Sequence, residues 1–210
     1  MAENLMIRTL RTTPAAHLTD LMEAATVSVT VDGERGVSLR EIAFAVQIGL
    51  RAEPGTASAA ALEAIMGVPL PTGHGQSTGD AQGQHVLWLA PDEFLAVDVS
   101  RQQVPGDADA LAQALDGLPG QAVDLSANRA LLELSGPSAR WVLEKGCPAD
   151  LHPRAFAVGT AIVTQLGPVP VILHRSAETE FRLYPRASFA DFLVRWLVDS
   201  MVEFRQEEVL

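Results

Sequence analysis

The chain has 210 residues, of which 48% are hydrophobic, so it can build one large domain or two small ones that share a core. Its formal net charge of -11 predicts no binding to nucleic acid or to anionic membranes, because an acidic surface repels phosphate. One cysteine, no apolar run near ~20 residues and no signal-like N-terminus lead us to expect a cytoplasmic protein.

Elements expected in the first half are short and are separated by turn signals. Thr56 and Gly67 are the expected N-cap and stop of an alanine-rich helix. Residues 68–83, rich in Gly, Pro, Ser and Thr, predict a long surface loop. In chain order we expect a short helix at 18–25, strands at 27–31 and 43–51, a helix at 56–66, strands at 86–89 and 94–99, and a helix at 108–117 capped by Asp107.

The second half predicts a similar succession. We expect strands at 121–126 and 129–134, a helix at 137–145, strands at 160–166, 169–174 and 180–184, and a helix at 188–202. The last helix has an expected core stripe of Phe189, Phe192, Leu193, Trp196, Leu197 and Met201. On its polar side, Arg195 is spaced to pair with Asp191 and with Asp199.

The order strand, strand, helix, strands, helix therefore occurs twice. This order predicts an α+β fold in which helices pack on antiparallel sheets. We divide the chain into two half-repeats, 1–118 and 119–210, which together form one compact domain. The first contains an N-terminal extension and the Gly-rich loop at 68–83.

Reactive residue types gather in the segment 135–153, which holds the only cysteine, Cys147, and the only lysine, Lys145. A nucleophilic cysteine needs a lowered pKa, but Cys147 follows a helix C-terminus, where the helix dipole disfavours a thiolate. Gly146 fits the helix stop, and Asp150 and His152 belong to the exit from the helix. We interpret the segment as structural.

Neither metal-binding nor cofactor-binding motifs occur in the sequence. None of the five histidines forms a metal-ligand spacing with another, and both GxGxxG and GxxxxGK[ST] are absent. The acidic pairs Asp92/Glu93 and Glu178/Glu180 lie on expected turns, where carboxylates are solvated. The residues therefore predict no catalytic, cofactor-binding or metal-ligating site in this chain. The histidines are His17, His74, His85, His152 and His174.

Five segments together resemble the gamma subunit family of heterotetrameric sarcosine oxidase. The most specific is 123–156 (VDLSANRALLELSGPSARWVLEKGCPADLHPRAF), where many positions match in one run. The others are 36–51 (GVSLREIAFAVQIGLR), 67–71 (GVPLP), 86–97 (VLWLAPDEFLAV) and 181–197 (FRLYPRASFADFLVRWL). Together the matches extend over most of the chain.

This resemblance implies a fold and a place in a complex. The fold is that of the folate-binding domain of glycine-cleavage aminomethyltransferase, a duplicated β2-α-β3-α unit. The implied role is an accessory or structural subunit beside alpha, beta and delta subunits, with FAD, FMN and NAD in the partners and none in this chain. The implied reaction converts sarcosine to glycine with oxygen as acceptor. It releases hydrogen peroxide, and the one-carbon unit leaves as formaldehyde or passes to tetrahydrofolate.

An alternative function stays open, namely a stand-alone folate-binding or one-carbon transferase-like protein. Ala127 stands where many aminomethyltransferase-like sequences have a histidine, and this departure weakens a folate role. For the subunit hypothesis, Trp141 and Arg140 are the candidate interface residues, since aromatic residues and arginine are enriched at interfaces. Trp88 is a further candidate for exposed aromatic surface, but it can equally belong to a strand of the core.

Overall fold

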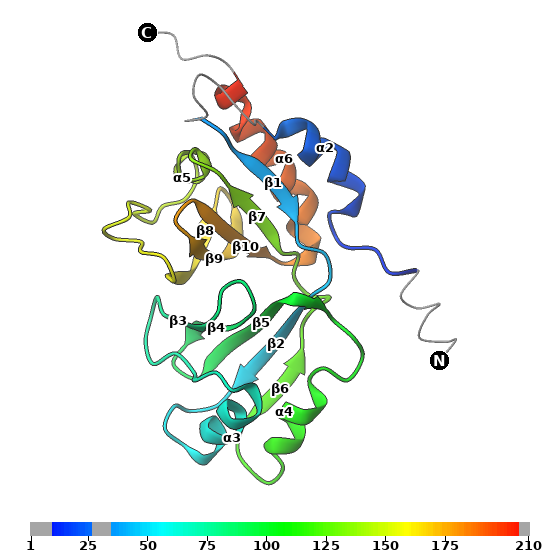
Figure 1. Cartoon of the computed structure of the whole chain (residues 1–210), viewed down its shortest axis with the longest axis vertical. Helices are drawn as coiled ribbons and strands as arrows, with labels where there is room; N and C mark the ends of the chain where they lie inside the picture. The colour runs from blue at the N-terminus through cyan, green and yellow to red at the C-terminus, as the bar shows by residue number, and fades with distance from the viewer. Residues whose placement is uncertain (1–9, 27–34, 206–210) are drawn as a thin grey trace.

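The computed structural model describes residues 10–26 and 35–205, which form two five-stranded antiparallel sheets with helices on their outer sides (Figure 1). We call β3-β4-β5-β2-β6 the first sheet and β1-β7-β10-β9-β8 the second sheet. The strands are β1 (Ser38–Glu41), β2 (Ala45–Arg51), β3 (Ser77–Gly79), β4 (Gln84–Ala90), β5 (Glu93–Gln102), β6 (Gln121–Asp124), β7 (Leu132–Ser135), β8 (Ala161–Leu166), β9 (Val169–Ala177) and β10 (Glu180–Pro185). The α-helices are α2 (Thr19–Ala25), α3 (Ala57–Met66), α4 (Asp109–Ala114), α5 (Ala139–Glu144) and α6 (Ala190–Ser200), and short 3-10 helices are η1 (Ala16–Leu18), η3 (Ala187–Phe189) and η4 (Val202–Arg205).

The predicted duplication is confirmed by the order of these elements. β1-β2-α3-β3-β4-β5-α4 is followed by β6-β7-α5-β8-β9-β10-α6, which is β2-α-β3-α twice. In each unit the first strand joins the other unit's sheet: β1 pairs with β7, and β6 pairs with β2. This exchange links the two halves by backbone hydrogen bonds, in addition to the side-chain packing between them.

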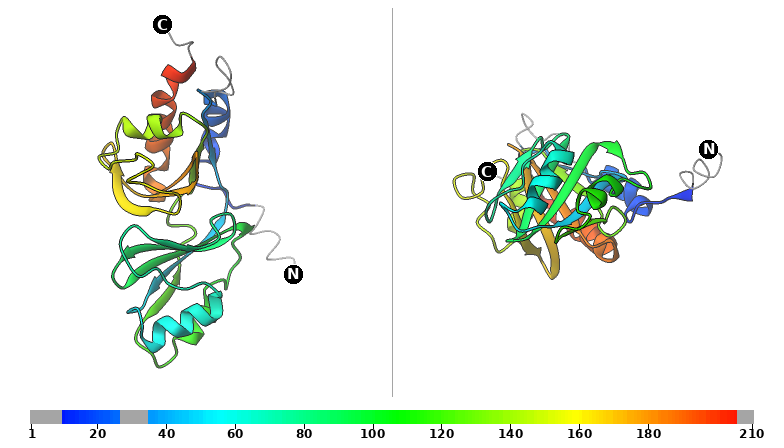
Figure 2. Two further views of the ribbon diagram at one scale, coloured as in Figure 1. Left: turned by 60° about the vertical axis from the view of Figure 1, so that its left-hand side comes forward. Right: turned by 90° about the horizontal axis from the view of Figure 1, so that it is seen from below.

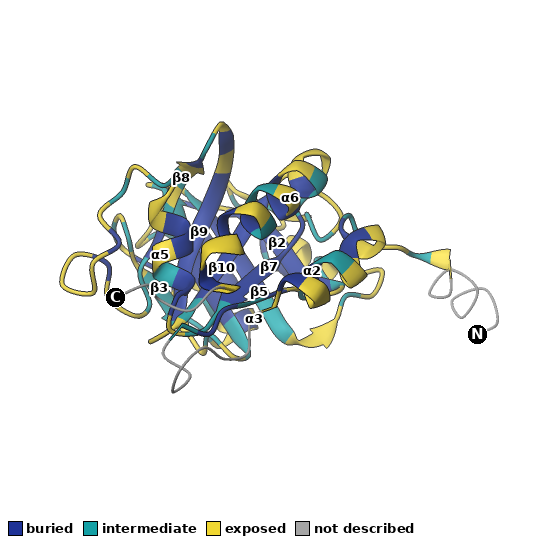
Figure 3. Cartoon of the chain, turned by 90° about the horizontal axis from the view of Figure 1, so that it is seen from above, coloured by how far each residue is buried: buried dark blue, intermediate teal, exposed yellow. Residues whose placement is uncertain are grey.

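Figure 2 shows the layers of helices and sheets from two further sides, and three apolar clusters hold these layers together. One lies between the second sheet and the helices α2, α5 and α6, and a second lies between the first sheet and α3 and α4. The third lies between the two sheets and includes Leu87, Leu95, Ile172 and Tyr184, each at most 1% exposed. Figure 3 shows the resulting pattern for the second sheet, whose strands are buried beneath helices with exposed outer faces.

Capping residues were predicted correctly at α3 but not at α4. The side chain of Thr56 accepts a hydrogen bond from the amide of Ala59, and Gly67 ends α3 with φ of 68°. At α4 the carboxylate of Asp107 instead bonds backward, to the amide of Val104 and to Arg101. Asp107 therefore secures the turn before α4 instead of capping the helix.

The predicted core stripe of α6 is partly wrong. Phe189 and Phe192 are 39% and 47% exposed, and the buried face is Ala190, Leu193, Val194, Leu197 and Ser200. The two phenylalanines lie beside this face, so the helix leaves both rings accessible to solvent. Arg195 pairs with Asp191 at 2.8 Å, as predicted, but among the described residues it forms no ion pair with Asp199.

Short strands escaped the sequence analysis. β1 and β3, of four and three residues, have too few positions to show an alternating pattern. β3 lies within the segment 68–83, which was expected to be loop throughout. The strand expected at 27–31 lies outside the described residues.

Candidate functional site

The segment that carries Cys147 forms a helix exit, as its sequence indicated. Cys147 is partly buried and packs against the core of the second sheet. The two polar side chains nearby contact local backbone: Asp150 accepts from the amide of His152 at 2.9 Å, and His152 Nδ1 accepts from the amide of Arg154 at 3.3 Å. These contacts stabilise a turn and do not direct the imidazole toward the thiol.

Lys145 and Gly146 connect α5 to the C-terminal helices. The ammonium of Lys145 donates to the carbonyl of Ser200 and pairs with Glu203 at 2.8 Å. Gly146 directly follows the C-cap Lys145, the position expected for the helix stop, but its φ is not positive, so it does not adopt the left-handed conformation typical of such a stop. Glycine is needed there for space, since Trp196 packs directly against it.

Two histidines that are far apart in sequence meet between the sheets. His85 of β4 and His174 of β9 have ring centroids 5.3 Å apart and are 1% and 0% exposed. Burial lowers the pKa of His85 to about 4 and that of His174 to about 3, with the Arg182 charge adding to both effects. Both rings are therefore neutral at neutral pH. Their spacing in the sequence gave no sign of this contact.

A buried ion pair lies beside the histidines. Arg182 Nε is 3.2 Å from Glu133 Oε2, and these residues are only 1% and 2% exposed. Glu133 also accepts a hydrogen bond from Arg40 Nε at 2.7 Å. The arrangement links β10, β7 and β1 within the second sheet, so its first role is to hold strands together.

Arg182 also fixes the Gly-rich segment 68–83 to the second sheet. Its guanidinium donates to the carbonyl of Ala81 and pairs with Glu180 at 3.0 Å. The expectation of a solvated acidic pair is therefore wrong for Glu180, whose side chain is 19% exposed, whereas Glu178 is 87% exposed. The hydrogen bond between Arg182 and Ala81 therefore joins the segment 68–83, in the first half of the chain, to β10 of the second sheet.

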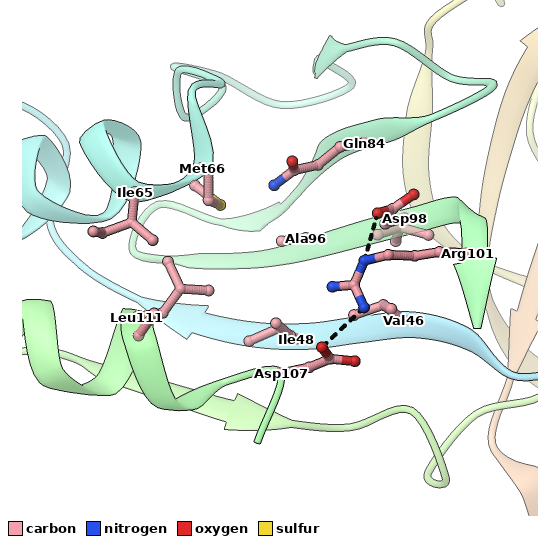
Figure 4. A pocket seen from close by; sticks show the side chains of 12 residues that line it. Val46, Ile48, Ile65, Met66, Gln84, Ala96, Asp98, Arg101, Asp107 and Leu111 are labelled. Atoms are coloured by element: carbon pink, nitrogen blue, oxygen red, sulfur yellow. Dashed lines mark hydrogen bonds and ion pairs between the residues drawn. The ribbon is translucent and has the colours of Figure 1, made fainter. Parts of the chain in front are cut away.

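A pocket of about 210 Å³ opens between α3, α4 and the first sheet (Figure 4). At its rim Arg101 bridges two carboxylates, with Nε 3.0 Å from Asp98 and Nη1 2.8 Å from Asp107. No histidine, cysteine, lysine, serine or threonine lines it, and its two carboxylates are paired with Arg101, so the lining offers no activated nucleophile. The apolar lining comprises Val46, Ile48, Ile65, Met66, Ala96, Val97, Ala110 and Leu111.

Within residues 10–26 and 35–205, the side chains form no group of three or more that could hold a metal ion. Over the same part of the chain, none of the helices is long and apolar enough to cross a membrane.

The candidate interface tryptophan lies on the outer helical layer. Trp141 is 52% exposed, and the guanidinium of Arg140 lies 4.1 Å from the centroid of its indole ring. Trp88 is partly buried, packs against the core beneath α3 and α4, and meets His74 edge to face at 5.3 Å. Trp141 is thus the more accessible of the two. Phe189 and Phe192 are accessible aromatic residues that the sequence analysis assigned to the core.

Solved structures of similar shape include a chain of heterotetrameric sarcosine oxidase from Corynebacterium sp. U-96 in complex with pyrrole 2-carboxylate. That match has a TM-score of 0.88 and 52% identity, and covers 96% of this chain and 100% of that one. Aminomethyltransferase T of the glycine cleavage system from Bartonella henselae matches with a TM-score of 0.64 at 21% identity. The matched region includes 91% of this chain and 58% of the aminomethyltransferase chain. At this identity the likeness shows a shared fold.

Curated relatives match over the full length. The sarcosine oxidase subunit gamma of Corynebacterium sp. strain U-96 is 52% identical, and that of Arthrobacter sp. is 48% identical, with 100% of both chains covered in each case. The family model described as "Sarcosine oxidase, gamma subunit family" matches residues 49–203. The chain therefore belongs to the sarcosine oxidase gamma subunit family.

Proposed function

We propose that this chain is the gamma subunit of a heterotetrameric sarcosine oxidase and that its role in the assembly is structural. The observation that carries this proposal is the match of 96% of the chain, at 52% identity, to a chain of such a heterotetramer. Its own chemistry agrees, because the buried Glu133 and Arg182 pair links strands of the second sheet and the segment that carries Cys147 forms a helix exit.

The complex that we propose contains alpha, beta and delta subunits and acts in the cytoplasm. It oxidises sarcosine to glycine with oxygen as acceptor, releasing hydrogen peroxide. The one-carbon unit leaves as formaldehyde or as methylene-tetrahydrofolate. FAD, FMN and NAD reside in the partner subunits, and tetrahydrofolate is used by the assembly.

The outer helical layer of the second sheet is the interface that we favour. Trp141, stacked beneath Arg140, has the residue types that dominate binding energy at protein interfaces. Phe189 at the end of η3 and Phe192 on α6 add exposed aromatic surface, and α6 packs beside α5. A permanent hetero-complex buries more than ~2,000 Å² of surface, so other regions contribute as well.

Co-expression with the three other subunits tests the proposal. We expect the chain to co-elute with them in size-exclusion chromatography and to be required for recovery of an intact complex. A chain that stays monomeric beside a complete and active partner complex would contradict the proposal.

Calorimetry with tetrahydrofolate on the separate chain tests the alternative. Saturable binding would favour the stand-alone folate protein. If millimolar tetrahydrofolate gives no heat of binding, the result favours the structural subunit over the folate-binding protein.

A further inference from the structure

The strand β8 is an edge of the second sheet and pairs along one side only, with β9 (Figure 1). Along its other side the described chain makes one backbone bridge, in which the amide of Ala161 donates to the carbonyl of Gly75 at 3.1 Å. Successive residues of an antiparallel strand direct their backbone groups to opposite sides. The residues of β8 whose amides and carbonyls point away from β9 are therefore Ala161, Val163 and Gln165.

The outward backbone groups of Val163 and Gln165 form an open row. The amide of Arg175 in β9 donates to the carbonyl of Thr160 at 2.9 Å, which agrees with this alternation. No described residue bonds to the outward groups of Val163 or Gln165, and both residues are exposed. Gly75 turns away from the edge after its one bridge, with φ of 79°. The hydrogen-bond ladder that it begins thus stops beside Val163.

The edge of β8 lacks the features that protect edge strands. Charged residues, prolines, bulges and very short strands prevent such edges from pairing with other chains. The other three edges have this protection: β1 carries Arg40 and Glu41, β3 has three residues, and β6 has four residues and ends at Asp124. β8 has six residues, AIVTQL, with neither charge nor proline, and its register with β9 is continuous. Such an edge is a template for another chain.

The sequence around β8 is free of charge as well. Residues 155–174 contain no Asp, Glu, Lys or Arg, although these types make up 20% of the chain. Val158 and Val163, within this stretch, are 51% and 56% exposed. The core of a protein interface is depleted in charged residues. The surface around β8 therefore has the composition of an interface core.

The distribution of charge also favours docking on the second sheet. Residues 52–124, which supply four strands of the first sheet, hold ten acidic residues and one arginine. Residues 125–205, which supply four strands of the second sheet, hold eight acidic and nine basic residues. Burying an excess of one charge is costly. We therefore expect the acidic first half to face solvent and the balanced second half to face a partner.

The edge of β8 adjoins the helical surface that we favour for assembly. The turn after β8 meets the exit of α5, where the amide of Gly167 donates to the carbonyl of Gly146 at 3.0 Å. Trp141, the exposed aromatic residue of α5, lies on the helix that ends there. One partner can therefore cover both regions.

We propose that an extended segment of a partner subunit pairs with the edge of β8 and adds a strand to the second sheet. Its backbone exchanges hydrogen bonds with Val163 and Gln165 and continues the ladder that Gly75 begins. Main-chain bonds of this kind give affinity, and the apolar surroundings select a segment without charges. The occupant is a partner and not a second copy, because a complex of four different subunits holds this chain once. In this respect the pairing rests on the proposed function.

Amide hydrogen exchange at single-residue resolution tests the pairing in the isolated chain and in the four-subunit complex. We expect the amides of Val163 and Gln165 to exchange at least about tenfold more slowly in the complex. Ala122 is the matched reference, because its amide points away from β2 at the edge of the first sheet, and its exchange should not change. A complex that forms without this protection would overturn the pairing and leave the proposed function intact. A chain that enters no complex would contradict both.

Substitutions separate the backbone of β8 from its side chains. Val163→Pro removes one outward amide and should weaken assembly at least about tenfold in a dilution series. The isolated variant should keep its circular dichroism spectrum, because proline is tolerated where an edge amide is unpaired. Val163→Thr keeps the amide and the branched shape, and Ala122→Pro places proline at the edge of the first sheet. Both control variants should assemble normally.

Three outcomes of these substitutions would refute the proposal. Equal weakening by Val163→Thr and Val163→Pro would show that the side chain makes the contact. Unchanged assembly of Val163→Pro would show that no strand is added there. An isolated chain that forms a dimer, and loses it in Val163→Pro, would assign the edge to a second copy.

Discussion

The indole of Trp196 lies so close to Gly146 that a β-carbon at residue 146 would be 2.6 Å from Cζ2 of the ring. Real β-carbons do not approach other atoms this closely, and the amide nitrogen of Gly167 at 3.1 Å closes the same space from another side. Gly146 therefore sets how closely the end of α5 approaches α6. The position requires the absence of a side chain, although its φ suits any residue.

Gly146→Ala should destabilise the fold by about 1–3 kcal/mol, the usual cost of overpacking a core. Urea unfolding of the full chain measures the change. Gly73→Ala is the matched control, because a β-carbon there would meet nothing closer than 3.6 Å. Trp196→Ala in the Gly146→Ala background should recover part of the loss, and additive losses would show that the two residues do not compete for this space.

Arg182→Met should cost about 3–5 kcal/mol of unfolding free energy, because it leaves the carboxylate of Glu133 buried with only Arg40 beside it. The same change at Arg51, whose pairs with Asp92 and Glu93 are exposed, should cost far less. Equal effects at the two arginines would show that the buried pair contributes no more than a surface pair.

Acid should destabilise the protein through His85 and His174. Their folded-state pKa values, about 4 and about 3, lie below the ~6.5 of an unfolded histidine. The unfolded chain therefore binds more protons as pH falls below about 6.5, and stability is lost between there and the folded-state pKa values.

His174→Leu should flatten the pH dependence of urea unfolding between about pH 6.5 and pH 4, because it removes one buried group that must stay neutral. Leucine fits this position, because Leu87 of β4 corresponds to His174 of β9 in the other half of the duplication. His152→Gln, on an exposed turn, is the control and should leave the pH profile nearly unchanged. An unaltered slope in His174→Leu would refute the role of the buried ring.

Local sequence rules predicted the elements that local interactions determine. Thr56 and Gly67 mark α3 correctly because their signals depend on neighbours within a few residues. The duplication followed from the order of such elements alone. Asp107 shows where such local rules fail. A carboxylate just before a helix can accept hydrogen bonds from the helix or from the residues that precede it, and here it pairs with the preceding Arg101.

Contacts between residues that are far apart in the chain could not be predicted from one sequence. His85 and His174 meet because β4 and β9 lie on facing sheets, and Glu133 meets Arg182 through strand register. The exchange of β1 and β6 between the sheets could not be predicted either, because a four-residue strand gives no sequence signal for its pairing partner. The exposure of Phe189 and Phe192 depends on how α6 is rotated against its sheet, and an aromatic stripe alone does not determine that rotation.

Cys147→Ser should leave the sarcosine oxidase activity of the reconstituted complex nearly unchanged. The thiol packs against the core, and His152 is engaged with local backbone, so no base activates it. We expect a small loss of stability from placing a hydroxyl in a partly apolar site. Loss of activity in a complex that still assembles would contradict the structural interpretation of this cysteine.

Trp141→Glu should weaken assembly by about 2 kcal/mol or more while the isolated chain stays folded, since the indole is exposed and α5 does not need it for its core. Ile65→Glu is the matched control, because Ile65 is also 52% exposed but lies on α3, under the other sheet. Size-exclusion chromatography over a dilution series compares the two variants with the unmodified complex. On dilution, the Trp141→Glu complex should dissociate at a higher protein concentration than the unmodified and Ile65→Glu complexes. Equal weakening by both variants would point to the added charge, and an intact Trp141→Glu complex would place the interface on another face.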